Sequence, residues 1–537
     1  MKAFALQHKY FLFILSIFIV CEFIVNPIGN FPLNDDWAYG KAVFISVNNG
    51  YTIGDFGAMT LFTHLIWGIG FVKIFGFSFT VLRISTLISA IISLFFLNKL
   101  IVKISNNQLL GFFACLLLLF NPLYFNLANT YMTDVNFCTL LILCCYFAFD
   151  FFKTKKTKYI FFFCLSSIGL VLIRQFGIVV PVCFFIACLF LKEKKAIISS
   201  ILVVIIVLAA LKGYEAFLRG IISPGAAYKF SGSIYLLSAK FWQNFFDNLV
   251  LKYNIILIHI LIYCFPLAIA YFSSVLKASN KLHALIVSVL SSLGVYFLFN
   301  DTHFPFHNIL TNMSLGPEVF YEGRGHTYSE NFELICEIVK YVFCSFTLTV
   351  IVLGLVFKFR TKKQWRLPSP QILFFLGVFG SYIFTILITE KDAYFDRYHL
   401  PIILVVILLL AFVNATFKFN YRWMILPLLC FFYVSVFGTK DYLALNRARW
   451  EAVNYIKSKA NVTTEKVNGG FEVNCWNDGK GNWWHDFGNM ASFDYLVQYR
   501  VEPEFKLLHS YPFQRYFPYK KDTLNLFMRY TKSSVAQ

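Results

Sequence analysis

Two adjacent carboxylates, Asp35 and Asp36, stand in the stretch NFPLNDDWAYGKAV, directly after an apolar run as long as a membrane span. A third acid, Asp134, opens a later apolar segment in the stretch YFNLANTYMTDVNF. Carboxylates at a membrane boundary are unfavourable unless they face a water-filled cavity, and a positioned carboxylate can act as a general base. The alternative is a solvated turn, since Asp and Asn favour helix N-caps.

Two arginines complement these acids. Arg174 lies between two apolar segments that are each short for a span and together too long for one, so we expect a hairpin with Arg174 at its tip. Arg397 lies in TEKDAYFDRYHLP, just before another apolar run. The planar guanidinium suits phosphate or carboxylate. The alternatives are a snorkelling Arg174 and an interfacial belt of polar and aromatic residues around Arg397.

Other polar clusters give weaker signals. Acids and histidines share the loop 300–334 without HxxxH or HExxH spacing, so no metal site is expected there; they are His303, His307, Glu318, Glu322 and His326. Three tryptophans in NCWNDGKGNWWHDFG suit either sugar stacking or the core of a small domain; they are Trp476, Trp483 and Trp484. No GxxxxGK[ST], GxGxxG or DxD motif occurs, which argues against a nucleotide donor.

Composition places these residues in a membrane protein. The chain of 537 residues is 58% hydrophobic and 14% charged, with a mean hydropathy of +0.65, too apolar for an ordinary soluble protein. The net charge of +19 comes from clusters between apolar runs, as topology signals do, so nucleic acid is not an expected partner. The 13 cysteines form no CxxC pair and predict neither a zinc site nor a disulfide framework.

The sequence predicts an all-α polytopic fold with about thirteen transmembrane helices and a small C-terminal α/β or α+β domain. The expected spans are 10–28, 81–102, 109–127, 135–152, 159–173, 176–191, 196–212, 249–273, 283–299, 335–357, 371–389, 399–416 and 423–438. An amphipathic helix at 63–77 is expected to lie along the interface within the first outer loop, 29–80. We therefore divide the chain into a membrane domain, 1–438, and an extracytoplasmic domain, 439–537.

The order and sidedness of the motifs resemble those of a known family. The stretches NDDWAY, KIFGFSFTVLRIS, YMTDV, LIRQFG and DRYHLP, over about residues 1–440, are similar to the C-type membrane glycosyltransferases. More narrowly they resemble glycosyltransferase family 39 and its bacterial relatives, which include the protein O-mannosyltransferases and the aminoarabinose transferase of lipid A. Asp35 falls at the position of the family's catalytic acid and Asp134 at its second-loop acid. The family usually has Asp-Glu where this chain has Asp-Asp, which leaves open which of Asp35 and Asp36 acts.

The resemblance implies a catalytic cavity at the outer face of the plasma (inner) membrane. It implies a polyprenyl-phosphate donor, a hexosyl or pentosyl group, and a lipid, glycan or protein acceptor, with a divalent cation as an open possibility. Expected contacts to the donor phosphate are Arg397, Arg174, Arg83 and His64, of which His64 is only a loose counterpart of the family's basic residue. Expected substrate contacts are Tyr39, Tyr131 and Tyr398.

Three rival functions stay open. A transporter or lipid flippase would place ionisable groups near the middle of the bilayer and often has broken helices in repeated halves. A lipid-linked oligosaccharide polymerase or ligase would use a large outer loop rich in Arg and His, such as 300–334. A non-catalytic assembly protein would have dispensable outer acids.

The expected topology has the N-terminus and the basic cluster 153–158 in the cytoplasm, and Asp35, Asp134 and residues 439–537 outside, because all basic clusters fall on one side. We predict that a membrane-impermeant thiol reagent labels a cysteine introduced at position 480 on intact cells and spares one at position 156. The parent protein supplies the background. Labelling at 156 without labelling at 480 would contradict the topology.

Overall fold

The chain forms a helical membrane protein. The computed structural model describes residues 9–222, 228, 239–306, 309–310, 330–361, 368–389, 394–460, 463–477, 492–517 and 519–530. This described part contains eight helices long and apolar enough to cross a membrane, or nine if one bent pair counts as a span. The polytopic fold is therefore confirmed. The count of thirteen is not, because several predicted spans form helices of 17 residues or fewer, such as α2, α9 and α17.

The helices of the first half are α2 (Lys9–Val25), α3 (Asp36–Asn49), α4 (Phe62–Phe75), α5 (Phe79–Ser105), α6 (Gln108–Leu119), α7 (Pro122–Ala128), α8 (Thr133–Thr154), α9 (Thr157–Val171), η1 (Gln175–Ile178), α10 (Val179–Leu189) and α11 (Lys194–Arg219). The later helices are α13 (Ala239–Ala278), α14 (Lys281–Phe299), α15 (Glu330–Thr361), α16 (Pro370–Leu387), η5 (Asp396–His399), α17 (Leu400–Ala411), η6 (Phe412–Ala415), η7 (Tyr421–Met424), α18 (Ile425–Phe432), the π-helical η8 (Tyr433–Phe437) and α19 (Gly438–Ala460).

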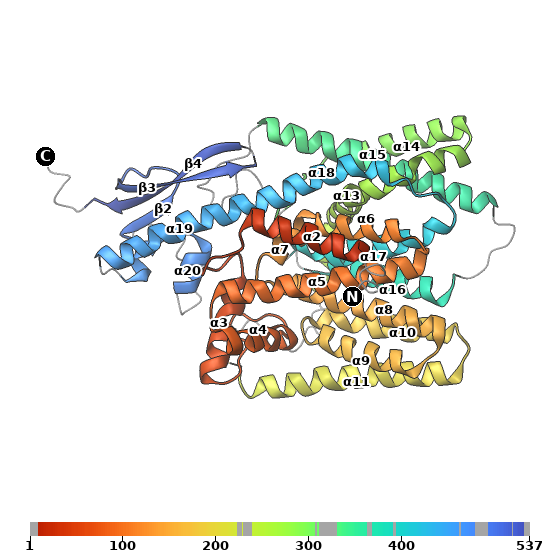
Figure 1. Ribbon diagram of the computed structural model, residues 1–537, viewed down its shortest axis with the longest axis horizontal. Coiled ribbons are helices and arrows are strands. Elements are labelled where there is room, and N and C mark those ends of the chain that lie inside the picture. Colours follow the sequence, from red (N-terminus) through yellow and green to blue (C-terminus); the bar gives the residue numbers. More distant parts are fainter. Residues whose placement is uncertain are drawn as a thin grey trace.

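The bundle is elongated, with most long helices along the long axis and a small β-sheet at one end (Figure 1). The connection between α10 and α11, which carries the basic cluster 192–195, lies at the opposite end (Figure 1). This separation agrees with the predicted sidedness, and the orientation of the termini stays a prediction.

The C-terminal domain is of the α+β type. Its elements are η9 (Thr464–Lys466), β1 (Val467–Asn468), α20 (Phe471–Asn477), β2 (Tyr495–Gln498), β3 (Phe505–Tyr516) and β4 (Tyr519–Arg529). The strand order is β1-β2-β4-β3, with β1 parallel to β2 and the other pairs antiparallel. The predicted boundary at 438/439 falls inside a continuous helical run from Tyr421 to Lys459, so the division into two domains stays a prediction.

The predicted span 109–127 is broken. α6 and α7 meet at an angle of 70°, because Pro122 cannot continue the hydrogen-bond pattern of α6. Asn121 caps α7 by accepting from the N–H groups of Leu123 and Tyr124, and Ser435 donates to the freed carbonyl of Phe120. The break turns the chain toward the loop that precedes Asp134.

The predicted hairpin around Arg174 is present, formed by α9 and α10 with η1 between them. The last carbonyls of a helix have no partner inside it. Here the start of α4 supplies them: the N–H groups of Leu61 and Thr63 donate to the carbonyls of Ile173 and Leu172, which follow α9, at 3.2 Å each. The hairpin tip is thereby fixed to α4.

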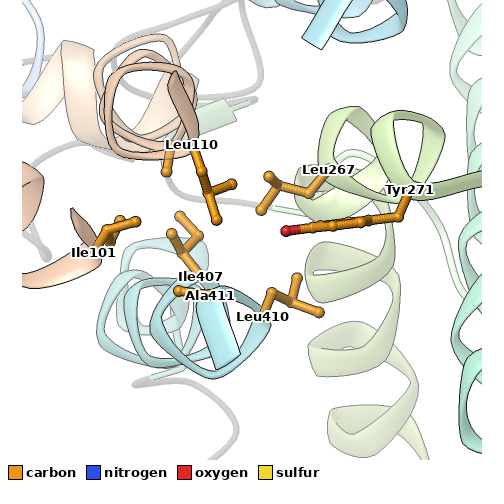
Figure 2. Close-up of a pocket in the computed structure, with 8 residues that line it drawn as sticks. Ile101, Leu110, Leu267, Tyr271, Ile407, Leu410 and Ala411 are labelled. Carbon is orange, nitrogen blue, oxygen red and sulfur yellow. The ribbon is translucent and has the colours of Figure 1, made fainter. Parts of the chain in front are cut away.

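The hollow in Figure 2 is an apolar seam rather than a candidate site. It lies where α5, α6, α13 and α17 meet and leaves no room for a water molecule. Its lining residues are Ile101, Leu110, Ala114, Leu267, Tyr271, Ile407, Leu410 and Ala411. None of the acids or arginines predicted to act lies in it.

Arg83 holds the chain that leads into the first outer loop. Its guanidinium, fully buried in α5, donates to the carbonyls of Pro27, Gly29 and Phe31. The Arg83 guanidinium, which we predicted to contact a donor phosphate, thus donates to backbone carbonyls through Nη1 and Nη2. We propose that Arg83 positions the segment between α2 and α3, which ends at Asp35.

We predict that Arg83→Gln lowers the melting temperature of the purified protein. Each charge-assisted hydrogen bond that is lost costs roughly 1.5 to 3 kcal/mol, and the buried carbonyls lose their donor. The control is Arg422→Gln, which removes the same charge at an exposed position. Equal melting temperatures for the two variants, measured by differential scanning fluorimetry, would contradict the positioning role.

Candidate active site

The first ion pair of the site joins Asp35 to Arg397. Asp35 occupies the N-cap position of α3 but makes no side-chain capping bond. Its Oδ2 instead accepts from Nη2 of Arg397 at 2.9 Å. The Arg397 side chain is 4% exposed and that of Asp35 is 31% exposed. Asp35 is thus the solvent-accessible member of the pair, and the reading of it as a mere helix cap does not describe its contacts.

The second ion pair joins Asp134 to Arg174. Asp134 lies in the first turn of α8, where a helix favours negative charge. Nη2 of Arg174 donates to its Oδ1 at 2.8 Å, and the same guanidinium donates twice to the hydroxyl of Thr133. Both side chains of the pair are less than one-tenth exposed. Arg174 is therefore not a snorkelling residue: it points inward from the hairpin tip.

Tyr398 and Tyr39 bring the two pairs into one site. The guanidinium carbons of Arg174 and Arg397 lie 5.6 and 5.8 Å from the centre of the Tyr398 ring. Burial raises the pKa of the Tyr39 hydroxyl, the charge of Asp35 raises it further, and the charges of Arg397 and Arg174 lower it. Residues from α3, α8, the α9–η1 turn and η5 thus converge, as expected for the two arginines.

Asp36 lies in the interior. Its side chain is 1% exposed, Oδ1 accepts from the N–H of Leu33, and Oδ2 accepts from the N–H of Tyr131 at 3.2 Å. Burial raises the pKa of Asp36 to about 8, against the lowering effects of Arg83 and of these two N–H groups. Asp36 ties the first outer loop to the loop before α8, and it is not placed to meet a substrate.

His64 and Tyr131 pack behind the ion pairs. Their rings stack at 4.2 Å, and the Tyr131 hydroxyl donates to the carbonyl of His64 at 2.9 Å. Asn136 contacts Nδ1 of His64 at 2.8 Å. Burial lowers the pKa of His64 to about 3, so the imidazole is neutral and offers a phosphate no charge. Tyr131 is fully buried and does not face a substrate.

Several buried polar atoms of the site have no partner among the described residues. They are Oδ2 of Asp134, Nε and Nη1 of Arg397, and Nε2 of His64. An unsatisfied buried polar group costs free energy comparable to a lost hydrogen bond, and such groups call for an explanation. A ligand with both anionic oxygens and hydroxyl groups would satisfy them.

Three residues that shape the site were not identified from the sequence: Thr133, Asp396 and Glu472. Thr133 binds Arg174, and Asp396 accepts from the N–H groups of Ile309 and Leu310, which fixes part of the long outer loop beside Arg397. Glu472 lies in the stretch NGGFEVNCW, where only its position in an apolar segment could have drawn attention. Trp476 packs against Phe77 and Phe79 rather than facing solvent as a sugar platform.

Other expectations fall on residues that are not described. These are Trp483, Trp484, His307, Glu318, Glu322 and His326. Within the described ranges, no group of three or more His, Cys, Asp or Glu side chains is arranged to hold a metal ion.

Comparison with known proteins places part of the chain in a family. The family model "Dolichyl-phosphate-mannose-protein mannosyltransferase" matches residues 61–213, the segment with His64, Asp134 and Arg174. No curated protein matches significantly. Crystal structures of ArnT from Cupriavidus metallidurans, bound to undecaprenyl phosphate and in the apo state, match at 10% identity over 98% of this chain and 99% and 98% of theirs. Their TM-scores of 0.45 and 0.43 are too low to carry a conclusion.

The segment 61–213 thus matches the model of the dolichyl-phosphate-mannose-protein mannosyltransferase family, which confirms the resemblance to glycosyltransferase family 39 that the motifs indicated.

Proposed function

We propose that the chain is an integral membrane glycosyltransferase that moves a hexosyl or pentosyl group from a polyprenyl-phosphate donor to an extracytoplasmic lipid, glycan or protein acceptor. The observation that carries the proposal is the pair of buried arginines beside Tyr398, with Nε and Nη1 of Arg397 left without a partner among the described residues. The family match over residues 61–213 supports the reaction class.

In this mechanism the acceptor hydroxyl oxygen attacks the anomeric carbon of the sugar. The bond between that carbon and the phosphate oxygen breaks, and the polyprenyl phosphate leaves with the electron pair. Negative charge on the phosphate grows during this step, and donors positioned in a water-poor site stabilise it strongly. Nε and Nη1 of Arg397 are the available donors, with Arg174 as the second cation.

Asp35 is the base that takes the proton of the acceptor hydroxyl. It is the only member of the two ion pairs that is substantially exposed, so an incoming hydroxyl can reach it. Arg397 holds Asp35 through Nη2 while its other N–H groups face the phosphate. One guanidinium therefore sets the distance between base and leaving group. Asp134, whose Oδ2 has no partner in the described part of the chain, orients the sugar or acceptor.

The site geometry favours a transferase over a transporter. Asp35 precedes α3, Asp134 begins α8, Arg174 follows α9, and Arg397 precedes α17. The charged groups thus lie at helix ends, which the sequence predicts to stand at the membrane boundary, whereas a transporter would carry them near the middle of the bilayer. A polymerase or ligase would rely on the loop 300–334, most of which is not described.

We predict that Arg397→Ala weakens binding of polyprenyl phosphate. A charge-assisted contact contributes roughly 1.5 to 3 kcal/mol, so the dissociation constant should rise about tenfold to a hundredfold. Arg397→Lys should retain only part of the affinity for polyprenyl phosphate, because Lys lacks the planar fork of the guanidinium. Microscale thermophoresis of the protein in nanodiscs measures this, with Arg422→Ala as the control. Unchanged binding together with a lower melting temperature would make Arg397 a structural anchor.

We also predict that Asp35→Asn and Asp134→Asn each abolish sugar transfer while the protein stays folded, since the amide keeps the shape and removes the charge. Asp36→Asn should instead lower the melting temperature and affect transfer less, because an amide offers one acceptor oxygen to two N–H groups. Mass spectrometry of polyprenyl-phosphate sugars and their products measures transfer. Near-normal turnover in both the Asp35 and Asp134 variants would remove the catalytic assignment.

A further inference from the structure

The turn that presents Asp35 is contacted by the C-terminal domain, 438 positions away in the chain. Asn34 has a left-handed backbone, with φ of 54°, and is fully buried. Its side-chain oxygen accepts from the N–H of Asp35 at 2.8 Å. Its own N–H donates to Oε1 of Glu472 in α20 at 3.4 Å. The residue before the proposed base is therefore held from outside the membrane domain.

Both carboxylate oxygens of Glu472 accept hydrogen bonds from α19. Glu472 is 3% exposed. The Tyr442 hydroxyl donates to Oε1, the atom that also accepts from Asn34. Nη1 of Arg449 donates to Oε2 at 2.6 Å. Both partners lie in α19, so the long helix that leaves the bundle fixes the position of Glu472 (Figure 1).

An apolar seam surrounds this contact. Trp37, one residue after the acid pair, clusters with Phe471 and Cys475 of α20 and packs edge-on against Phe56 at 4.8 Å. Trp476, also in α20, packs against this cluster and contacts the rings of Phe77 and Phe79, just before and at the start of α5. The docked domain thus excludes water from the Asn34–Glu472 hydrogen bond, which strengthens it.

We propose that Glu472 is a positioning residue through which the C-terminal domain holds the Asn34–Asp35 turn, so that the docked domain is part of the catalytic unit. This inference rests on the proposed function, because Asp35 must be the base for its position to matter. A displaced turn lengthens the contact between Asp35 and Arg397, but the arginines keep their places in the fold, since Arg397 lies on η5 and Arg174 beside η1, paired with Asp134. The turn therefore affects the chemical step and not the binding of the donor phosphate.

Two substitutions separate positioning from stability. Glu472→Gln keeps the length and the acceptor oxygen for Asn34 but loses the ion pair with Arg449. Glu472→Asp keeps the charge but is one methylene too short to reach Asn34 and Arg449 together. We expect the Gln variant to have the lower melting temperature and nearly normal kcat. The Asp variant should lose kcat about tenfold to a hundredfold, as small misplacements of catalytic groups do, with unchanged affinity for polyprenyl phosphate.

The matched control is Asp522→Asn, which breaks a buried ion pair with Arg515 in the sheet, at 3.0 Å, without touching the turn. It should lower the melting temperature and leave kcat unchanged. All variants are measured as full-length protein in nanodiscs, with a polyprenyl-phosphate sugar that the wild type consumes. If kcat follows the melting temperature across the three variants, Glu472 is merely structural and the inference fails. If the wild type neither binds polyprenyl phosphate nor consumes any donor, the proposed function fails instead.

Discussion

The burial of two guanidinium groups beside one tyrosine ring is the constraint on which the outer end of the molecule depends. Removing a charged group from water costs several kcal/mol, and this cost is recovered only when a partner of opposite charge is well placed. Arg174 and Arg397 find such partners in Asp134 and Asp35. The four residues come from four different elements, so the hairpin tip, the start of α3, the start of α8 and η5 must converge. The hydrogen bonds from the start of α4 to the end of α9, and those from Arg83 to the first loop, support that convergence.

Hydropathy and charge were sufficient to predict the helical fold, the small C-terminal domain and the hairpin around Arg174, because each is a property of a continuous segment. The same reasoning identified Asp35, Asp134, Arg174 and Arg397 as polar groups at helix ends. It could not pair them. Asp35 and Arg397 are 362 positions apart, and whether two such groups meet depends on packing that no local pattern encodes. The physical depth of a lipid-linked phosphate suggested their convergence, and the contacts around Tyr398 agree with it.

For some residues the contacts in the structure differ from the predicted ones. In these cases the sequence identified a side chain that could bind a ligand but not the group that this side chain contacts. Arg83 and Tyr131 have side chains of the kind that bind ligands, yet both donate hydrogen bonds to backbone carbonyls. Asp36 is the residue next to Asp35, but its side chain is buried, whereas that of Asp35 is partly exposed. The sequence alone does not show this difference. The Asn121–Pro122 pair is typical of a helix start, but the prediction of one span over 109–127 rested on the apolar run alone. Glu472 had only the weak signal of an acid in an apolar segment, since its role depends on docking of the C-terminal domain.

The central claim is that the two ion pairs around Tyr398 form the binding site for a polyprenyl phosphate. Photo-crosslinking tests it most directly, with a polyprenyl phosphate that carries a photoreactive group next to the phosphate and with peptide mapping by mass spectrometry. The account predicts labelling in residues 394–399 or 35–39 that excess unlabelled polyprenyl phosphate suppresses. Labelling confined to lipid-facing helices such as α14, whose side chains are largely exposed, and insensitive to competition would contradict it.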